Sequence, residues 1–249
     1  MSRVYNRVPD AHDPHDPHYK IRVTASVLPN RVDERRLFSP VENQDVLGSC
    51  TGHAFVGALE YLENQQREDF VRLSRLFVYF NERLLEGTTR SDAGAQIRDG
   101  VRVLAKYGVC DEKLWPYDEK RFRHRPTEDA YENGLLHKAT AFSKIDQTEH
   151  ALCAALAARN PVVFGIVVYE SFESDEVAKT GLVPMPSAKE KCLGGHAVCM
   201  AGYDRGSRHF LVRNSWGADW GIGGYFWLPF DFVLDPHLSD SFWAVNRIE

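Results

Sequence analysis

Apolar residues recur at helical spacing through the first half of the chain. They predict one helix over residues 48–67, a second that begins after Ser74, and a third that ends near Gly108. The three stripes consist of Ala54, Phe55, Ala58, Leu59 and Leu62, then Phe77, Phe80 and Leu84, then Ile97, Val101 and Leu104. Gly52 and Gly57 interrupt the first stripe, and each costs a helix about 1 kcal/mol relative to alanine. We therefore expect another part of the chain to approach this helix closely at the two glycines.

The second half of the chain predicts strands. After one more helix around residues 148–159, four short runs rich in β-branched and aromatic residues are separated by glycines. These runs are PVVFGIVVY, HAVCMAGYD, HFLVRNSW and GGYFWL. Helices followed by strands are typical of an α+β protein. This order predicts two lobes, a helical lobe over about residues 35–137 and a β-rich lobe over about residues 138–249.

Residues 1–27, here called the N-terminal arm, differ from the rest of the chain. They are polar, contain three prolines and show neither helical nor strand periodicity. An extension that is solvated or draped over the protein is the favoured interpretation. His12, His15 and His18 recur every third residue, so they would share one side of a polyproline-like segment. A weak metal site on these three histidines is the alternative.

The composition is that of a soluble globular protein, with 43% hydrophobic and 26% charged residues. The net charge of −5 does not favour a nucleic-acid surface. No apolar run reaches the roughly 18 residues that a membrane span requires, and the arm lacks the apolar segment of a secretory signal. We therefore expect a cytoplasmic monomer with no nucleic-acid or membrane partner, although non-classical export stays open.

The five cysteines are odd in number and do not occur at zinc-finger spacings, so reduced thiols are expected and neither a metal nor a cofactor is implied. Cys50 is the candidate for chemistry, in the stretch QDVLGSCTGHAF at residues 44–55. It stands at a predicted helix start, where unpaired N–H groups and the helix dipole favour a thiolate. The alternative is a small buried residue, which is a common role for cysteine.

A base for Cys50 is found at His196. It follows two glycines and opens the predicted strand HAVCMAGYD, so it has room to face a cleft. Asn214, in RNSWGADWGIGGY, can accept a hydrogen bond from the imidazole ring and fix its tautomer, while Trp216 covers that bond. A structural histidine and a glycine-rich turn with aromatic packing are the corresponding alternatives.

Together these motifs resemble the papain family of cysteine peptidases, in a bacterial branch with a short N-terminal extension. The motifs are Gln44, Gly48-Ser49-Cys50, Gly195-His196-Ala197 and Asn214-Ser215-Trp216-Gly217. Further landmarks spread the resemblance over most of the chain: Leu28-Pro29, Pro40 to Gln44, Asp92-Ala93-Gly94, Lys106-Tyr107-Gly108 and Trp115-Pro116-Tyr117. The resemblance implies a papain-like two-lobe fold. A helical left lobe would carry the nucleophile and a β-barrel-like right lobe the histidine and asparagine, with the active-site cleft between them.

The resemblance also implies a cysteine-type endopeptidase that needs no cofactor and acts on peptide or protein substrates. Cys50 would attack the peptide carbonyl, and His196 would pair with it and protonate the leaving amine. Asn214 would orient His196, and Gln44 would donate to the oxyanion beside the Cys50 backbone N–H. The residues implied in substrate binding are Gly94, Ala95, Gly195, Trp216 and Trp220.

The chain departs from the family at three places. Leu47 and the segment Asp92-Ala93-Gly94 lack the two cysteines of the usual disulfide, so packing of Leu47 is expected to hold the cysteine loop instead. Thr51 replaces the aromatic residue that usually follows the nucleophile, which puts the substrate preference in doubt. The segment DFVLDPHLSDSFWAV does not align securely with the family, so the floor of the main specificity pocket and the P2 preference stay open.

Two alternatives to an active endopeptidase remain. One is a catalytically silent papain-like scaffold that binds peptides or partner proteins, and its hallmark would be loss of the cysteine, histidine or glutamine. The other is a related acyl-transfer enzyme such as a transglutaminase, an amidase or a peptide ligase, in which an acid usually orients the histidine. The N-terminal arm is too short for a folded pro-domain, and we expect it to lie over or near the cleft and regulate access.

Overall fold

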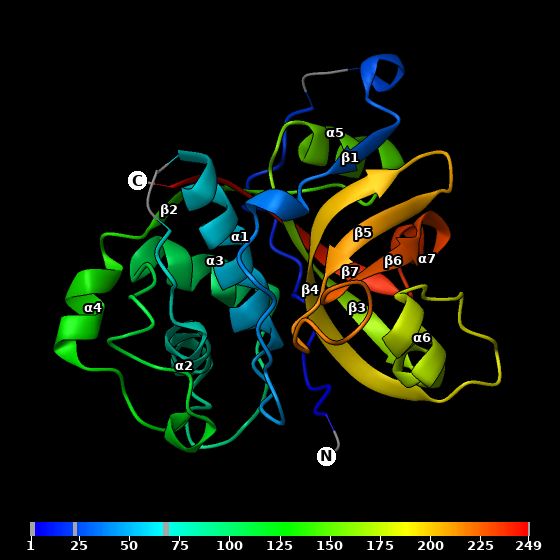
Figure 1. Ribbon diagram of the computed structural model, residues 1–249. Coiled ribbons are helices and arrows are strands. Elements are labelled where there is room, and N and C mark those ends of the chain that lie inside the picture. Colours follow the sequence, from blue (N-terminus) through cyan, green and yellow to red (C-terminus); the bar gives the residue numbers. More distant parts are fainter. Residues whose placement is uncertain (1–2, 22–23, 67–69, 249) are drawn as a thin grey trace.

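The computed structural model describes residues 3–21, 24–66 and 70–248. Helices α1 to α4 gather on one side, and most of the sheet lies on the other side together with α5, α6 and α7, which gives two lobes with α1 at their junction (Figure 1). The α-helices are α1 (Cys50–Gln66), α2 (Arg75–Glu86), α3 (Ile97–Lys106), α4 (Glu128–Gly134), α5 (Glu149–Ala157), α6 (Asp175–Thr180) and α7 (Phe230–Leu234). Short 3-10 helices are η1 (Ala25–Val27), η2 (Arg35–Leu37), η3 (Glu119–Arg121) and η4 (Glu170–Glu173). The α+β architecture expected from the sequence is confirmed.

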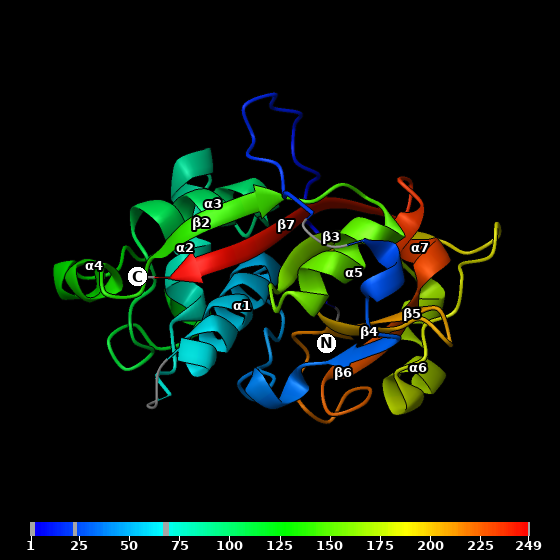
Figure 2. The same ribbon diagram turned by 90° about the horizontal axis from the view of Figure 1, so that it is seen from above.

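Seven strands form one sheet in the order β2-β7-β3-β4-β5-β6, with β1 paired to β4, and every pairing is antiparallel. The strands are β1 (Arg31–Asp33), β2 (Ala139–Lys144), β3 (Val162–Tyr169), β4 (Cys192–Asp204), β5 (His209–Arg213), β6 (Tyr225–Pro229) and β7 (Ser239–Ile248). Strands β2 and β7 run together from the sheet towards the helices (Figure 2). Strand β7, the last strand of the chain, therefore packs against α1, the first long helix.

Helix α1 is buried from Cys50 to Glu63 because it lies between α2 and the sheet. Its two glycines stand where other groups approach most closely. A Cβ on Gly52 would lie 2.7 Å from the Arg75 carbonyl oxygen, and one on Gly57 would lie 2.9 Å from the Arg213 Nε. The close approach predicted from these glycines is confirmed.

A buried ion pair fixes α1 against α2. The Arg75 guanidinium donates to both carboxylate oxygens of Glu60, at 3.0 and 2.7 Å, and both side chains are almost fully buried. Breaking such a pair leaves an uncompensated charge in the interior, at a cost of about 3–5 kcal/mol. The pair therefore specifies how the helix that carries the candidate nucleophile sits in its lobe.

The predicted helices agree well with the structure, and one strand boundary is corrected. The stripe over residues 48–67 is α1, and the third helix ends at Lys106 with Gly108 in the left-handed region at φ +65°. Strand β4 begins at Cys192, so His196 lies inside the strand and does not open it. Gly194 and Gly195 keep their places in the β3 ladder, so the strand continues through them.

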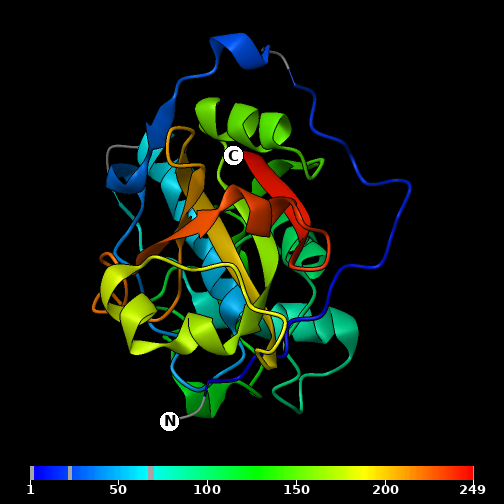
Figure 3. The ribbon, with the colours of Figure 1, turned by 90° about the vertical axis from the view of Figure 1, so that its right-hand side faces the viewer.

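The first part of the described N-terminal arm passes between the two lobes (Figure 1), and the arm then loops out along one edge of the molecule (Figure 3). It makes isolated bridges to both, pairing Asn6 with Gly195 of β4 and Val8 with Gln96 before α3. Further on, His18 bridges Lys144 at the end of β2. Among the described residues, no helix is long and apolar enough to cross a membrane.

Candidate active site

Cys50 is the first residue of α1 and is 1% exposed. Its sulfur accepts from the backbone N–H groups of Thr51 and Ala197, so the helix start and strand β4 meet at the thiol. Both contacts stabilise negative charge on sulfur, and the Arg7 guanidinium acts in the same direction. Burial outweighs them and raises the pKa of the Cys50 thiol to about 11.

His196 is fully buried next to the residue that contacts the Cys50 sulfur. Its Nε2 lies 2.9 Å from Asn214 Oδ1, and the Ser215 backbone N–H donates to the same oxygen at 2.9 Å, which fixes the amide orientation. Since an amide oxygen only accepts, Nε2 carries the ring proton. Nδ1, which has no hydrogen-bond partner among the described residues, is left with its lone pair available to take the thiol proton.

The Trp216 ring covers the histidine, stacked at 5.2 Å between centroids and 27° between planes. It keeps water from the His196–Asn214 hydrogen bond, as expected from the sequence. Trp220 packs behind it at 4.9 Å and also contacts Phe172 and Phe226. Trp220 therefore supports the wall of the site through Trp216.

Gln44 lies in the loop before the nucleophile and is 1% exposed. Its Oε1 accepts from the Ser215 hydroxyl at 2.5 Å, and its backbone N–H donates to the Ser215 carbonyl at 2.9 Å. The hydroxyl contact fixes the orientation of the amide and turns Nε2 to the other side, where it donates to the Leu47 carbonyl at 2.9 Å. A primary amide has two N–H groups, so one remains for an oxyanion. Ser215 therefore positions Gln44, a role the sequence analysis missed.

A carboxylate holds the cysteine loop, residues 44–49, where the resemblance to the papain family led us to expect the loss of a disulfide. Both Asp92 carboxylate oxygens accept from the Gly48 N–H, at 3.1 and 3.0 Å, and the Tyr79 hydroxyl donates to the same carboxylate. That hydroxyl also accepts from the Gly94 N–H at 3.1 Å, which ties the segment before α3 to the same point. Leu47 packs into an apolar cluster with Phe77 and Trp115, as the sequence predicted. Hydrogen bonding and packing together replace the covalent clamp.

Replacing Asp92 with alanine is expected to destabilise the protein by about 1–3 kcal/mol, because the Gly48 N–H and the Tyr79 hydroxyl lose their acceptor. The free energy of unfolding in urea measures this change. Asp219→Ala, which removes an exposed acid in the loop after Trp216, is the matched control. If the two variants unfold at the same urea concentration, Asp92 does not clamp the loop.

Thr51 does not face the cleft. Its hydroxyl donates to Glu82 of α2 at 2.7 Å, and both residues are fully buried. Burial raises the pKa of Glu82 to about 8. The substitution of the usual aromatic residue therefore changes the contact between α1 and α2.

The N-terminal arm passes directly over these groups. The Arg7 N–H donates to the Gly195 carbonyl at 3.3 Å, and the Gly195 N–H donates to the Tyr5 carbonyl at 3.2 Å. A Cβ on Gly94 would lie 2.3 Å from the Asn6 carbonyl oxygen, so Gly94 and Gly195 are glycines because backbone crosses them. Ala95 is buried beside Gly94. The two glycines expected to bind substrate are thus occupied by the arm.

The start of the arm covers the histidine and tryptophan. The Tyr5 ring packs edge-on against His196 and Trp216, at 6.1 and 6.2 Å between centroids. The Arg3 guanidinium lies 4.0 Å from the centre of the Trp216 ring, a cation–π contact. Because this cover excludes water, burial lowers the pKa of the His196 imidazole to about 4. With the arm in place, thiol and imidazole are both neutral near pH 7.

Two ion pairs, of which the Asp16–Arg98 pair is buried on both sides, hold the arm down. Arg7 pairs with Asp240 of β7, and Asp16 pairs with Arg98 of α3 through two hydrogen bonds of 3.2 and 2.5 Å. Asp10 accepts from the Arg98 backbone N–H at 2.9 Å and from the Trp243 indole at 2.8 Å. The arm is therefore anchored to both lobes.

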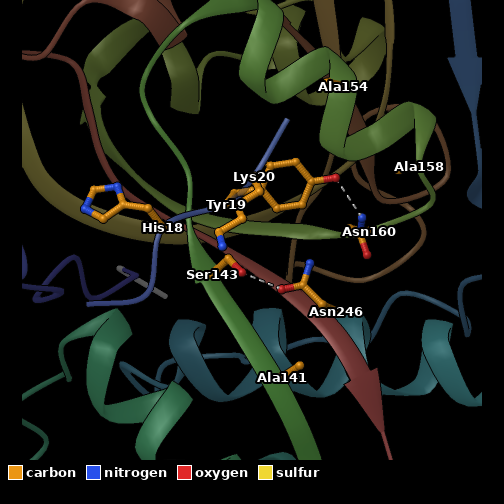
Figure 4. Close-up of a pocket in the computed structure, with 9 residues that line it drawn as sticks. All are labelled: His18, Tyr19, Lys20, Ala141, Ser143, Ala154, Ala158, Asn160 and Asn246. Atoms are coloured by element: carbon orange, nitrogen blue, oxygen red, sulfur yellow. Dashed lines mark hydrogen bonds between the residues drawn. The ribbon is translucent and has the colours of Figure 1, made fainter. Parts of the chain in front are cut away.

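The far end of the arm closes a hollow against the sheet edge (Figure 4). Tyr19 accepts from Asn160 at 3.2 Å, and Ser143 of β2 donates to Asn246 of β7 at 2.9 Å. The hollow contains none of the four candidate catalytic residues. It marks the point where the arm leaves the cleft and docks on β2.

The histidines of the arm make contacts other than metal ligation. His15 contacts Asp13 at 3.1 Å and His18 contacts Asp146 at 3.5 Å. In residues 3–21, 24–66 and 70–248, no group of three or more histidine, cysteine or acidic side chains is arranged to hold a metal ion. The five cysteines are free thiols, as the sequence analysis expected.

This fold and site define a class of hydrolase in which a cysteine at a helix start faces a histidine oriented by an asparagine. The model of the papain family cysteine proteases matches residues 28–231. The chain belongs to this family, and the resemblance read from the sequence is confirmed. It is a cysteine protease, and peptides or proteins are its substrates.

Relatives in sequence include a viral protein and a human cathepsin. The chain is 44% identical over 217 residues to an uncharacterized peptidase C1-like protein of Acanthamoeba polyphaga mimivirus, covering 83% of this chain and 69% of that protein. It is 29% identical over 208 residues to human cathepsin L2, covering 80% of this chain and 60% of that protein. The chain thus spans about two thirds of the length of these relatives.

Solved structures agree in fold. Xylellain, a cysteine protease from Xylella fastidiosa, superposes with a TM-score of 0.91 at 35% identity, covering 100% of this chain and 99% of that one. Digestive procathepsin L 3 of Tenebrio molitor superposes with a TM-score of 0.73, covering 93% of this chain and 75% of that one. At 18% identity the second match supports the fold alone. The predicted papain-like two-lobe fold is confirmed, while its placement in a bacterial branch stays a prediction.

Proposed function

We propose that this protein is a cysteine endopeptidase that its own N-terminal arm holds inactive, and that Cys50, His196, Asn214 and Gln44 carry out its chemistry. The observation that carries the site assignment is the oriented imidazole of His196. Asn214 holds its protonated Nε2, and its unpaired Nδ1 is buried next to the residue that contacts the Cys50 sulfur. Oriented in this way, the ring can take the thiol proton.

The reaction follows from these positions. Cys50 passes its proton to His196 Nδ1, and the thiolate attacks the peptide carbonyl carbon. The negative charge that develops on the carbonyl oxygen is stabilised by the free N–H of Gln44 and by the Cys50 backbone N–H. As the tetrahedral intermediate collapses, the C–N bond breaks and His196 returns the proton to the leaving amine, which leaves a thioester on Cys50. His196 then takes a proton from water, and the resulting hydroxide attacks the thioester. Collapse of this second intermediate breaks the C–S bond and releases the carboxylic acid and the Cys50 thiolate, which takes the proton back from His196.

The direction of the arm supports the proposed latency. Tyr5 lies beside His196 and Trp216, where the leaving amine would be protonated, while Arg7 lies beyond Gly195 on the acyl side. The arm therefore runs from the leaving-group side to the acyl side, whereas a substrate runs the other way along its own chain. A peptide in this orientation covers the cleft without presenting its carbonyl groups as a substrate does.

Neither alternative is favoured by a specific observation. A silent scaffold would lack the nucleophile, the histidine or the oxyanion donor, and all three are in place. In the acyl-transfer enzymes an acid would usually orient the histidine, whereas here the partner is the amide oxygen of Asn214. We further propose a monomer that works in the cytoplasm without a nucleic-acid or membrane partner. A net charge of −5 and five free thiols support this assignment.

Replacing Gln44 with alanine in the protein without its N-terminal arm tests the proposed chemistry. The variant is expected to lose about 100-fold in kcat with little change in KM, because an oxyanion donor acts in the transition state and contributes roughly 3 kcal/mol. Gln65→Ala, which changes a glutamine near the other end of α1, is the matched control and should retain full activity. A kcat of Gln44→Ala within twofold of the kcat of the parent protein, and equal to that of Gln65→Ala, would show that Gln44 has no part in the oxyanion site.

A further inference from the structure

The side chain of Arg7 fills a closed pocket in the wall of the cleft. Arg7 is 4% exposed, although arginine is rarely buried. Space for its guanidinium comes from Gly165 in the middle of β3, where a Cβ would lie only 2.2–2.5 Å from three guanidinium atoms. Gly165 pairs with Ala197, the residue after His196, and with Asp240 on β7. The pocket is therefore built into the strands next to the catalytic histidine.

The floor of this pocket is a carboxylate. Arg7 Nη1 donates to Asp240 Oδ1 at 2.5 Å, and Nη2 donates to Oδ2 at 2.7 Å. The Asp240 side chain is 26% exposed even with the arm docked, so it stays partly hydrated. This two-point pairing matches the planar fork of a guanidinium, which an ammonium cannot reproduce. Burial tends to raise the pKa of Asp240, but the hydrogen bonds and charge of Arg7 outweigh it, so the pKa lies below its usual value.

The position of the pocket assigns it to the acyl side of a substrate. Asn6 packs against Gly48, two residues before the nucleophile, and Arg7 is the next residue of the arm away from Trp216. The leaving amine lies on the Trp216 side, so the Arg7 side holds residues that precede the scissile bond. Asn6 occupies the position nearest to the nucleophile, and Arg7 lies one residue further on. The pocket that holds Arg7 therefore corresponds to the second residue before the scissile bond.

We propose that Gly165 and Asp240, here called the Asp240 pocket, select substrates with arginine as the second residue before the scissile bond, and that Arg7 occupies the pocket as a built-in mimic. This proposal rests on the proposed peptidase function and names its substrate class. A leucine in the pocket would leave the Asp240 carboxylate unpaired and only partly hydrated, whereas arginine pairs with both oxygens. The discrimination expected from a charge-assisted pair is on the order of 10- to 100-fold in kcat/KM.

The test uses the full chain carrying Arg7→Ala, which vacates the pocket and leaves Asp240 intact. Fluorogenic peptides that differ only at the second residue before the scissile bond carry arginine, citrulline, lysine or leucine. Comparing ratios of kcat/KM within one variant removes the effect of arm docking, because a docked arm lowers every rate equally. Citrulline has the shape of arginine without its charge, so it probes Asp240 without altering the protein.

The arginine peptide is expected to exceed the citrulline and leucine peptides by at least tenfold, with lysine in between. Adding Asp240→Asn should bring the arginine-to-leucine ratio to near 1, and adding Gly165→Ala should also lower it by filling the pocket. Asp231→Asn, which changes an acid whose side chain is 74% exposed, is the matched control and should leave the ratio unchanged.

An arginine-to-leucine ratio below 2 in Arg7→Ala, or a ratio that Asp240→Asn does not lower, would overturn the proposal. In that case hydrolysis of the leucine peptide would still support the proposed peptidase function. If none of the four peptides is cleaved by any variant, the peptidase assignment fails and the pocket proposal fails with it.

Discussion

Deleting residues 1–27, the N-terminal arm, is expected to raise the rate of peptide hydrolysis by on the order of 10³-fold. Two ion pairs, the partly exposed Arg7–Asp240 pair and the buried Asp16–Arg98 pair, hold the arm in place. Loss of one partner of a buried pair costs about 3–5 kcal/mol, which corresponds to a factor of roughly 10² to 10⁴ in the ratio of docked to open arm. The measurement is the initial rate on one fluorogenic peptide for the full chain and for the deletion variant.

A charge reversal in the full chain provides the control for this deletion. Arg7→Glu leaves the length of the arm unchanged but places two carboxylates together at Asp240, so it should recover much of the activity of the deletion variant. Arg36→Glu, in the middle of η2 and outside the arm, should leave the rate of the full chain unchanged. Equal rates for the full chain, the deletion variant and Arg7→Glu would show that the arm does not control access.

Replacing Cys50 with alanine is expected to abolish peptide hydrolysis, with a loss on the order of 10⁶-fold in the arm-deleted protein. Removal of a nucleophile or its base in a comparable acyl-transfer site costs about this much, and the two losses do not add, because the residues act as a unit. His196→Ala should therefore be nearly as inactive as Cys50→Ala, and the double variant no worse. The readout is kcat/KM with the best peptide.

Cys199→Ala is the matched control for the loss of a buried thiol. Cys199 lies on β4 three residues after His196 and is fully buried in the same apolar cluster as Cys50. It is not placed in the chemistry, so its variant should retain activity within a few-fold. Substantial hydrolysis by Cys50→Ala, or an equal loss in Cys199→Ala, would contradict the assignment of the nucleophile.

The parts of this protein that could be predicted from the sequence depend on local patterns. The apolar stripe of α1 and the capping residue Ser74 predict helices because neighbours three and four residues apart share a face. The motif around Cys50 and the one around Asn214 are short and contiguous, so each could be recognised by itself. The close approaches at Gly52 and Gly57 were predicted for the same reason, since a glycine inside a helix indicates crowding.

The parts that could not be predicted depend on contacts between distant residues. The Asp92 carboxylate holds Gly48 across 44 positions, and no local pattern indicates which acid replaces a missing disulfide. Asp240 meets Arg7 across 233 positions, within a segment that has no secure family alignment. Gly94 and Gly165 lie beside these contacts. A glycine indicates that another group approaches the backbone closely, but it does not indicate which group that is.

The start of β4 shows a related limit. Two glycines before His196 suggest a strand end, because glycine weakens a strand. In the structure the strand continues through them, because Val168 and Val167 of β3 supply partners for Gly194 and Gly195. A Cβ on either glycine would clash with the arm, so the close approach of the arm, and not the end of a strand, accounts for these two glycines.

The most direct test of the central claim is the alkylation rate of Cys50 by iodoacetamide between about pH 4 and 9, with each cysteine quantified by peptide mass spectrometry. In the full chain, burial holds the pKa of Cys50 at about 11 and that of His196 at about 4, so alkylation should be slow across this range. Removing the arm should make it fast well below pH 7, since hydrated thiol and imidazole can then form an ion pair. His196→Ala in the arm-deleted protein should abolish this low-pH reactivity. An arm-deleted protein whose alkylation rises only near the free-thiol pKa of about 8.5, with or without His196, would contradict the account.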